Sequence, residues 1–141
     1  MKILNDELSS ESINRVLFFF APVALPIKDG ALVPEEEASD THYATTIYDV
    51  DSGEFKIFEF GNRIKNAIAG YKKRHESFDK LQILMTRHDS GKIKITAGRL
   101  IEESFLLDNI PNIEELKITN SNLLDDYLSN TGYTVKDIEV I

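Results

Sequence analysis

Cysteine is absent from this chain of 141 residues. Its absence excludes disulfide bonds, thiolate nucleophiles, and zinc or iron–sulfur sites that cysteine would hold. A chain without cysteine fits a reducing, intracellular compartment, so we expect the protein to act in a cytoplasm.

Long hydrophobic runs are also lacking, because no stretch approaches the roughly 20 apolar residues of a membrane span. The longest apolar run covers residues 16–26. Asp6, Glu7 and Glu11 precede it, where a signal peptide would carry positive charge. We therefore predict a buried strand in this region and no membrane partner.

Motifs for catalysis and phosphate binding are missing as well. The sequence contains no GxSxG, GxxxxGK[ST] or GxGxxG. His42, His75 and His88 lie far apart, without the spacing of metal ligands. The acidic runs, such as residues 35–37 and 114–115, are typical of solvated surface. The sequence predicts no catalytic residue, no metal and no cofactor, and hence a protein that is not an enzyme.

The charge distribution is the first positive feature of the chain. The net charge is −8, and the length and the hydrophobic fraction of 42% suit one globular domain. Residues 54–99 carry eleven basic and five acidic side chains, whereas residues 1–53 and 100–141 each have a net charge of −7. A basic middle between acidic flanks indicates either a surface for a polyanion or an ordinary solvated helix face.

The pattern of residues predicts a mainly β fold with minor α structure. Strands are expected over residues 13–20, 45–50, 54–60, 81–87 and 92–96, with Pro22 and Pro26 ending the first strand. Turns with glycine join the second strand to the third and the fourth to the fifth. Between the two hairpins, Ile64, Ala67 and Ile68 have helical spacing. Residues 27–42 have the composition of a loop.

The C-terminal part is acidic and predicts helical turns. Pro111 is expected to begin a turn that runs to residue 116, and Asn120 or Ser121 to cap a separate helix ending at residue 128. Residues 133–141 fit a strand or a short amphipathic segment. We divide the chain into a core of residues 1–110 and an acidic segment of residues 111–141, which packs on the core or docks partners.

Basic and aromatic residues alternate in the middle of the chain. Binding of single-stranded nucleic acid requires a cationic groove and aromatic rings on which bases stack. Phenylalanines in such a pattern also fit an ordinary core. The predicted nucleic-acid-binding residues are Lys56, Phe58, Phe60, Arg63, Lys65, Tyr71, Arg87, Lys92, Lys94, Arg99 and Tyr48.

Residues 44–99 resemble the core of phage-type single-stranded DNA-binding proteins, which have an OB fold. The resemblance lies in the strand KIFEFG at residues 56–61, the helix start Arg63-Ile64 with Ile68, and the strand pair with Arg87 and SGKIKI at residues 90–95. It implies a five-stranded OB-like barrel with one helix between strands, and sequence-independent binding of single-stranded DNA in phage replication and recombination. The location it implies is the cytoplasm of the host bacterium.

The same resemblance implies an acidic tail that docks replication partners, although here the tail also has apolar helical spacing. Two other functions remain open. The chain could be a protein-binding module, such as an inhibitor, immunity factor or transcription regulator, that uses an acidic flank on a basic partner. It could also be a structural subunit of a larger assembly, whose oligomeric state the sequence does not give.

Overall fold

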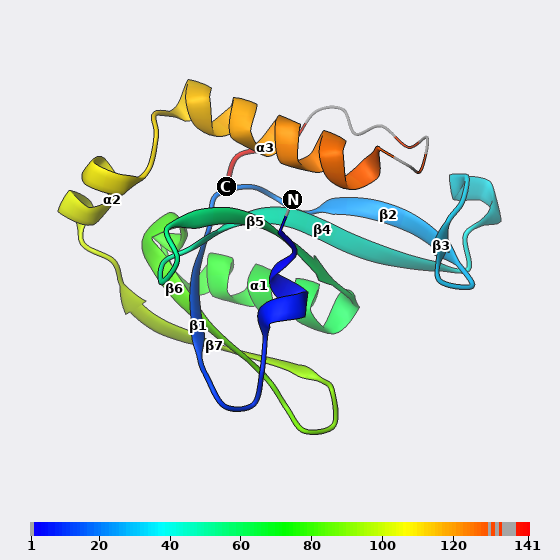
Figure 1. The fold of residues 1–141 in the computed structure, drawn as a ribbon, viewed down its shortest axis with the longest axis horizontal. Helices are drawn as coiled ribbons and strands as arrows, with labels where there is room; N and C mark the ends of the chain where they lie inside the picture. The colour runs from blue at the N-terminus through cyan, green and yellow to red at the C-terminus, as the bar shows by residue number, and fades with distance from the viewer. Residues whose placement is uncertain (1, 130, 132, 134–137) are drawn as a thin grey trace.

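A computed structural model describes residues 2–129, 131, 133 and 138–141 of the chain (Figure 1). The strands are β1 (Asn14–Phe18), β2 (Val23–Lys28), β3 (Ala31–Leu32), β4 (Asp40–Asp49), β5 (Glu54–Phe60), β6 (Leu81–Arg87) and β7 (Ile93–Leu100). The α-helices are α1 (Asn62–Arg74), α2 (Glu103–Asn109) and α3 (Ile113–Leu128), and the short 3-10 helices are η1 (Leu4–Glu7), η2 (Glu35–Glu37) and η3 (Phe78–Lys80).

The long strand β4 organises a seven-stranded antiparallel sheet. One edge of β4 pairs with β5, and its other edge pairs first with β2 and then with β1. Strand β1 pairs in turn with β6, and β6 pairs with β7. The prediction of a mainly β fold with minor α structure is confirmed.

Both predicted hairpins form, each with a glycine in the left-handed region. In the turn between β4 and β5, Gly53 has φ +70° and its N–H donates to the Asp49 carbonyl at 2.8 Å. In the turn between β6 and β7, Gly91 has φ +91°. Glycine adopts these angles without the steric cost that a Cβ brings.

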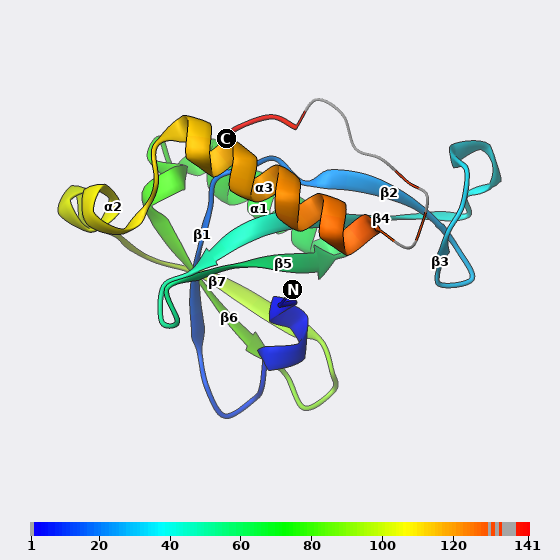
Figure 2. The ribbon, with the colours of Figure 1, turned by 45° about the horizontal axis from the view of Figure 1, so that its top comes forward.

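Two helices cover opposite faces of the sheet (Figures 1 and 2). On one face, Ile64 and Ile68 of α1 pack into a core cluster that includes Phe18 and Phe58. On the other face, the apolar stripe of α3 packs on residues of β2, β4 and β5: Leu25, Ala44 and Ile57 contact the cluster of Leu124 and Leu128. The amphipathic helix predicted after β5 is confirmed, and the acidic C-terminal helix packs on the core.

The prediction of a loop over residues 27–42 is wrong, because this segment contributes to strands. Asp29 and Gly30 both have positive φ, 53° and 79°, and they join β2 to β3 by a two-residue turn. Asp-Gly is the pair that such a turn favours, so the sequence carried a signal that we did not use. Strand β2 also runs through Pro26, whose carbonyl accepts from the Val33 N–H at 3.0 Å.

The predicted break between two C-terminal helical segments is also wrong. Helix α3 is continuous over 16 residues, and the Asn112 side chain caps it by accepting from the Glu115 N–H at 3.0 Å. Asn120, predicted as a possible cap, lies inside the helix and is 2% exposed. Tertiary packing along one face of α3 stabilises the helix through this polar position.

The chain ends lie against the sheet. The Ile57 N–H donates to the Lys2 carbonyl at 3.1 Å, next to the edge of β5. Residues 138–141 lie beside residues 19–21, with hydrogen bonds from Ala21 to Glu139 and from Ile141 to Phe19, both at 2.8 Å. This part of the segment 133–141 therefore pairs like a strand, and residues 134–137 lie outside the described residues. None of the described helices combines the length and apolar character needed to cross a membrane.

Candidate nucleic-acid interface

Four of the predicted nucleic-acid-binding residues are buried. Lys56 is 1% exposed, Phe58 0%, and Phe60 and Tyr48 4% each. A ligand cannot reach these side chains in the folded protein, so their assignment to a binding surface is wrong. The predicted period-two alternation is present in β5, but the face that these residues share points into the core beneath α1.

Lys56 is held in a buried ionic triad. Its ammonium Nζ donates to Asp49 Oδ2 at 2.6 Å and to Glu7 Oε1 at 3.0 Å. The Asp49 side chain is 3% exposed and the Glu7 side chain 42%. Burial alone would lower the pKa of Lys56, but hydrogen bonds to Asp49 and Glu7 and the charges of both carboxylates raise it. The triad connects β5 with β4 and with η1.

The aromatic residues on these strands pack against one another. The rings of Phe58 and Phe60 are stacked with centroids 5.0 Å apart, and Phe18 meets Phe58 edge-on at 6.3 Å. On the opposite face, Tyr48 contacts Phe55 at 5.1 Å. Burial, and secondly the charge of Asp49, raise the pKa of Tyr48. These rings therefore belong to the hydrophobic core, which was the alternative interpretation of the phenylalanine pattern.

Helix α1 carries the strongest positive charge on the surface. Its 13 residues include five basic side chains and no acidic one. Arg63, Lys72, Lys73 and Arg74 are exposed. Exposed cations on a helix without carboxylates cannot neutralise each other, so the helix presents a net charge to solvent.

Two aromatic rings accompany these cations. The Lys65 ammonium lies 5.0 Å from the centroid of the Tyr43 ring, and the Arg74 guanidinium lies 5.1 Å from that of Tyr71. Both tyrosines are half-buried. Of the predicted aromatic residues, Tyr71 therefore keeps a partly accessible ring beside a cation.

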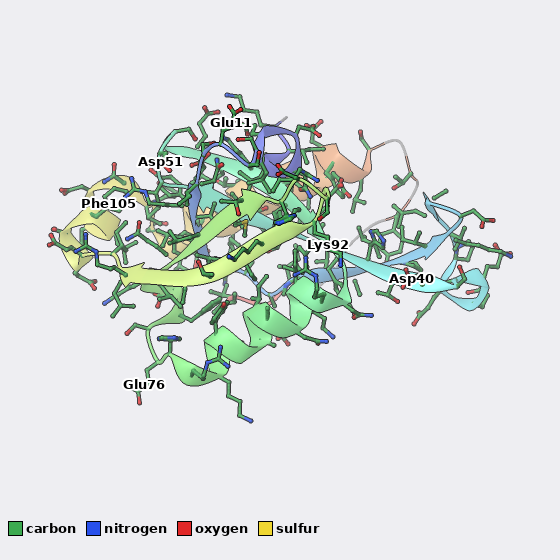
Figure 3. The ribbon with its side chains drawn as sticks, turned by 90° about the horizontal axis from the view of Figure 1, so that it is seen from below. Glu11, Asp40, Asp51, Glu76, Lys92 and Phe105 are labelled. Atoms are coloured by element: carbon green, nitrogen blue, oxygen red, sulfur yellow. The ribbon has the colours of Figure 1, made fainter. Side chains whose placement is uncertain are left out.

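The turn between β6 and β7 lies next to the start of α1. Arg63 Nη2 donates to the Ile93 carbonyl at 2.6 Å, which ties the helix to the first residue of β7. Figure 3 shows α1 and β7 on the side of the molecule where Lys92 is labelled. Lys92 and Lys94 are exposed. We define the basic surface as the side chains of Arg63, Lys65, Lys72, Lys73, Arg74, Lys92 and Lys94.

Two predicted binding residues, Arg87 and Arg99, lie outside the basic surface. Arg87 donates to the carbonyls of Asn5 at 2.7 Å and Gly91 at 3.0 Å, so it anchors the N-terminal segment and the turn. Arg99 is exposed near the far end of β7, roughly 20 Å from Lys92 at the usual rise of a strand. Lys72, Lys73 and Arg74 were missing from the predicted set. The lack of acidic residues in 62–74 could have identified them.

Negative charge gathers on the other side of the sheet. Helix α3 carries four exposed carboxylates and a single lysine. Helices α1 and α3 cover opposite faces of the sheet (Figure 1), so the two signs of charge are separated across the molecule. A polyanion would be attracted to the side of α1 and repelled from that of α3.

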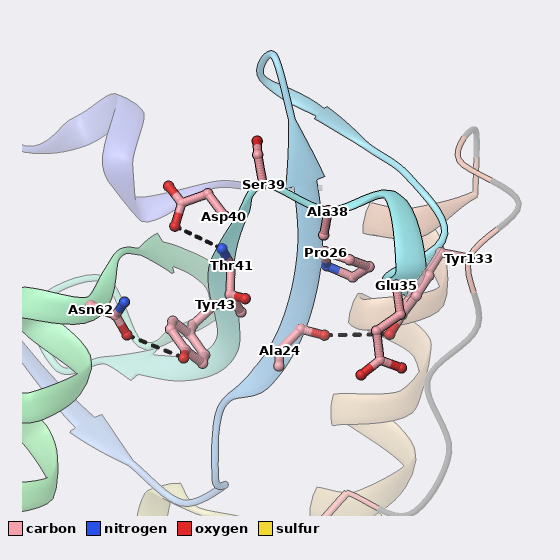
Figure 4. Close-up of a pocket in the computed structure, with 10 residues that line it drawn as sticks. All are labelled: Ala24, Pro26, Glu35, Ala38, Ser39, Asp40, Thr41, Tyr43, Asn62 and Tyr133. Carbon is pink, nitrogen blue, oxygen red and sulfur yellow. Dashed lines mark hydrogen bonds between the residues drawn. The ribbon is translucent and has the colours of Figure 1, made fainter.

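A cavity of about 550 Å³ is lined by strands β2 and β4, by residues 35–39 and by the start of α1 (Figure 4). Tyr43 donates its hydroxyl to Asn62 Oδ1 at 3.2 Å inside it, and the Tyr133 hydroxyl reaches the Ala24 carbonyl at 3.4 Å. Glu35 and Asp40 also line the cavity. Two carboxylates and no cation in the lining make it unsuitable for a phosphate group.

Across residues 2–129, 131, 133 and 138–141, no three His, Cys, Asp or Glu side chains gather where they could hold a metal ion. The chain matches no family model and no solved structure. It is similar to the DNA-directed RNA polymerase subunit beta' of Oenococcus oeni, with 31% identity over 135 residues. The similarity covers 87% of this chain but 11% of that subunit, so the chain spans about a tenth of the length of the relative it matches.

Proposed function

We propose that this chain binds single-stranded DNA without sequence preference through its basic surface, and that it catalyses no reaction. The observation that carries the proposal is helix α1, with five basic residues, no acidic residue and four exposed cations. Lysine and arginine on such a surface neutralise phosphates and release the counterions condensed on them. Phe60 and Lys65 cover the two faces of the Tyr43 ring, and Arg74 lies over the Tyr71 ring, so the parts of these half-buried rings left for bases are chiefly their edges.

The order of the strands supports the proposal of an OB-like core. The pairings give the path β5-β4-β1-β6-β7, and α1 lies between β5 and β6 in the sequence. An OB fold is a partly open, five-stranded Greek-key barrel with this order, and many of its members bind oligonucleotides. Among the pairings of the described residues, none joins β5 to β7, and α1 contacts both strands.

Because α3 covers part of the sheet, we propose a site away from the usual OB surface. OB folds bind oligonucleotides on the face of their second and third strands, which correspond here to β4 and β5. The outer face of β4 and β5 is covered, because Ala44 and Ile57 pack against Leu124 and Leu128 of α3. We therefore assign DNA binding to the exposed side of α1 and the β6–β7 turn.

The proposed role is the coating of single strands in the cytoplasm of a bacterium, in phage replication or recombination. Binding should depend steeply on salt, since seven phosphate contacts on a single strand would give a slope of log K against log salt of about −5. Because the large core aromatics are buried, electrostatic attraction should supply more of the affinity than base stacking does.

The test is fluorescence anisotropy of labelled dT oligomers at two salt concentrations. The variants Lys72→Glu/Lys73→Glu and Lys92→Glu/Lys94→Glu each remove two cations of the basic surface. The matched control is Lys28→Glu/Lys117→Glu, which changes the net charge equally on exposed residues outside this surface.

We expect each of the two surface variants to bind about tenfold more weakly at low salt and to have a shallower salt slope. The control should stay close to the wild type. Equal weakening in all three variants would show that only net charge matters. Absence of binding by the wild type at low salt would refute the function.

A second candidate function is that of a module in a transcription complex. The similarity to a stretch of an RNA polymerase beta' subunit favours this candidate. Like the first candidate, it is a function in a complex with nucleic acid. Co-elution of the purified chain with bacterial core RNA polymerase in size-exclusion chromatography would support this candidate. Separate elution together with salt-sensitive dT binding would favour the first.

A further inference from the structure

Helix α2, the start of α3 and residue 140 expose large aliphatic side chains. Leu107 is 76% exposed, Ile113 44% and Val140 40%. Burying such a side chain removes apolar surface from water and so stabilises a complex. Exposed aliphatic residues that are close together therefore mark a surface on which another molecule can pack.

These three residues line one apolar cavity. The cavity has a volume of about 420 Å³ and lies between α2, the first turn of α3 and residues 140–141. Buried residues also line it, with Phe19 6% and Leu116 5% exposed. We call this site the α2–α3 groove, and its lining also includes Leu106, Ile110 and Pro111.

The groove is surrounded by negative charge. Residues 102–115 contain five carboxylates and no lysine or arginine. Glu103 forms an ion pair with Lys80, and Asp79 also lines the cavity. Glu102, Asp108, Glu114 and Glu115 are exposed in or next to α2 and the first turn of α3, and the nearest exposed cation on α3 is Lys117. This combination of an apolar floor and an acidic rim selects for a partner that is both apolar and cationic.

We infer that the α2–α3 groove binds a cationic amphipathic helix of another protein. An amphipathic helix lays apolar side chains at positions i, i+3, i+4 and i+7 into such a groove, and its flanking lysines and arginines meet the acidic rim. A second copy of this chain offers its own acidic groove, so a symmetric contact would oppose like charges. Nucleic acid is excluded from this surface by the same repulsion.

The inference does not rest on the proposed binding of DNA. The groove lies on α2 and α3, whereas the basic surface lies on α1 and β7. The protein could therefore hold a strand on one side and a partner on the other, and each interaction can be removed separately.

The probe is a synthetic 15-residue helix of leucine, alanine and lysine with leucines at i, i+3, i+4 and i+7. A scrambled peptide of the same composition serves as the peptide control. Titration calorimetry gives the affinity, and amide chemical-shift changes show where each peptide binds. The protein variant is Leu107→Ser/Ile113→Ser, and its matched control is Ile118→Ser. Ile118 is 61% exposed on α3 but does not line the cavity.

We expect the amphipathic peptide to bind at least about tenfold more tightly than the scrambled one. The double variant should lose about tenfold or more in affinity, while Ile118→Ser stays within about twofold of the wild type. Shifts should concentrate on α2 and the first turns of α3. All substituted residues are exposed, so the variants should keep the wild-type thermal unfolding curve.

Three outcomes would overturn the inference. Equal affinity for both peptides, or unchanged binding by Leu107→Ser/Ile113→Ser, would show that negative charge alone attracts the peptide. Self-association of the wild type that Leu107→Ser abolishes, measured by analytical ultracentrifugation, would assign the groove to a second copy. None of these results depends on whether dT oligomers bind.

Discussion

Replacement of Lys56 by methionine tests whether the buried triad holds the strands together. Methionine has nearly the length of lysine but no charge, so the substitution removes the cation while keeping the packing of β5. The Asp49 side chain, 3% exposed, would then be a buried carboxylate without its cation. It would keep a hydrogen bond from the Asp51 N–H at 3.1 Å.

The expected loss of stability is large for a small domain. Removing one partner of a buried ion pair typically costs about 3–5 kcal/mol, because the remaining charge stays desolvated. The total free energy of unfolding of such a domain is about 5–15 kcal/mol. Glu7 is partly exposed and regains water when Lys56 is lost, so the unpaired Asp49 should account for most of the cost.

The assay is urea unfolding followed by circular dichroism, since the chain has no tryptophan. We expect Lys56→Met to lower the free energy of unfolding by about 3 kcal/mol or more. The double variant Lys56→Met/Asp49→Asn should recover part of this loss, with a coupling energy of about 1–3 kcal/mol. The control Lys2→Met breaks the exposed Lys2–Glu54 pair and should cost less than about 1 kcal/mol.

The same variant separates a structural role of Lys56 from a role in binding. A loss below about 1 kcal/mol would refute the reasoning from burial. If instead Lys56→Met were as stable as the wild type but bound dT oligomers more weakly, Lys56 would contact DNA after all. The pKa of Lys56 is raised in the folded protein, so Lys56 stabilises the fold fully below the ordinary lysine pKa of about 10.4. This stabilisation is lost as the pH rises through the raised pKa of the folded state.

Three further changes have defined outcomes. Asn120→Leu should raise the free energy of unfolding by about 1 kcal/mol in urea, because the buried Asn120 Oδ1 has no hydrogen-bond partner in the described part of the chain. Gly53→Ala should lower it by about 1 kcal/mol, because Gly53 has φ +70°. Burial and a hydrogen bond with Glu59 raise the pKa of Tyr127 well above 10, so ultraviolet absorbance should show a late-titrating tyrosine that Tyr127→Phe removes. The stability that Tyr127 contributes is complete below pH of about 10 and falls as the pH rises.

Local patterns in the sequence determined most of the β core. The hairpins around Gly53 and Gly91 and the helix with Ile64 and Ile68 follow from turn residues and periodicity, which act over a few neighbouring positions. The same information placed Lys56, Phe58 and Phe60 on one face of a strand. It did not say whether that face meets solvent, because this depends on which helix packs against it.

Tertiary structure decided which residues are accessible. Sequence pattern alone makes Lys56 and Lys92 equivalent, since each is a lysine in or beside a strand. Asp49 and Glu7 neutralise the first within the core, whereas the second lies on an exposed turn. Glu7 could not be identified as a partner beforehand, because it is 49 residues away from Lys56 in the chain. Asp49 is only 7 residues away, across the predicted hairpin, but the sequence did not show on which face of the sheet the two side chains meet.

The composition of the chain by itself determined that charge is divided into a basic middle and acidic flanks. Only the packing of α1 and α3 on opposite faces of the sheet turned this division into two separate surfaces. The apolar groove beside α2 arises in the same way, from residues 19, 107, 113 and 140, which meet only after folding. The physical reason is that side-chain exposure results from contacts between distant segments, whereas strands, turns and helices result from local ones.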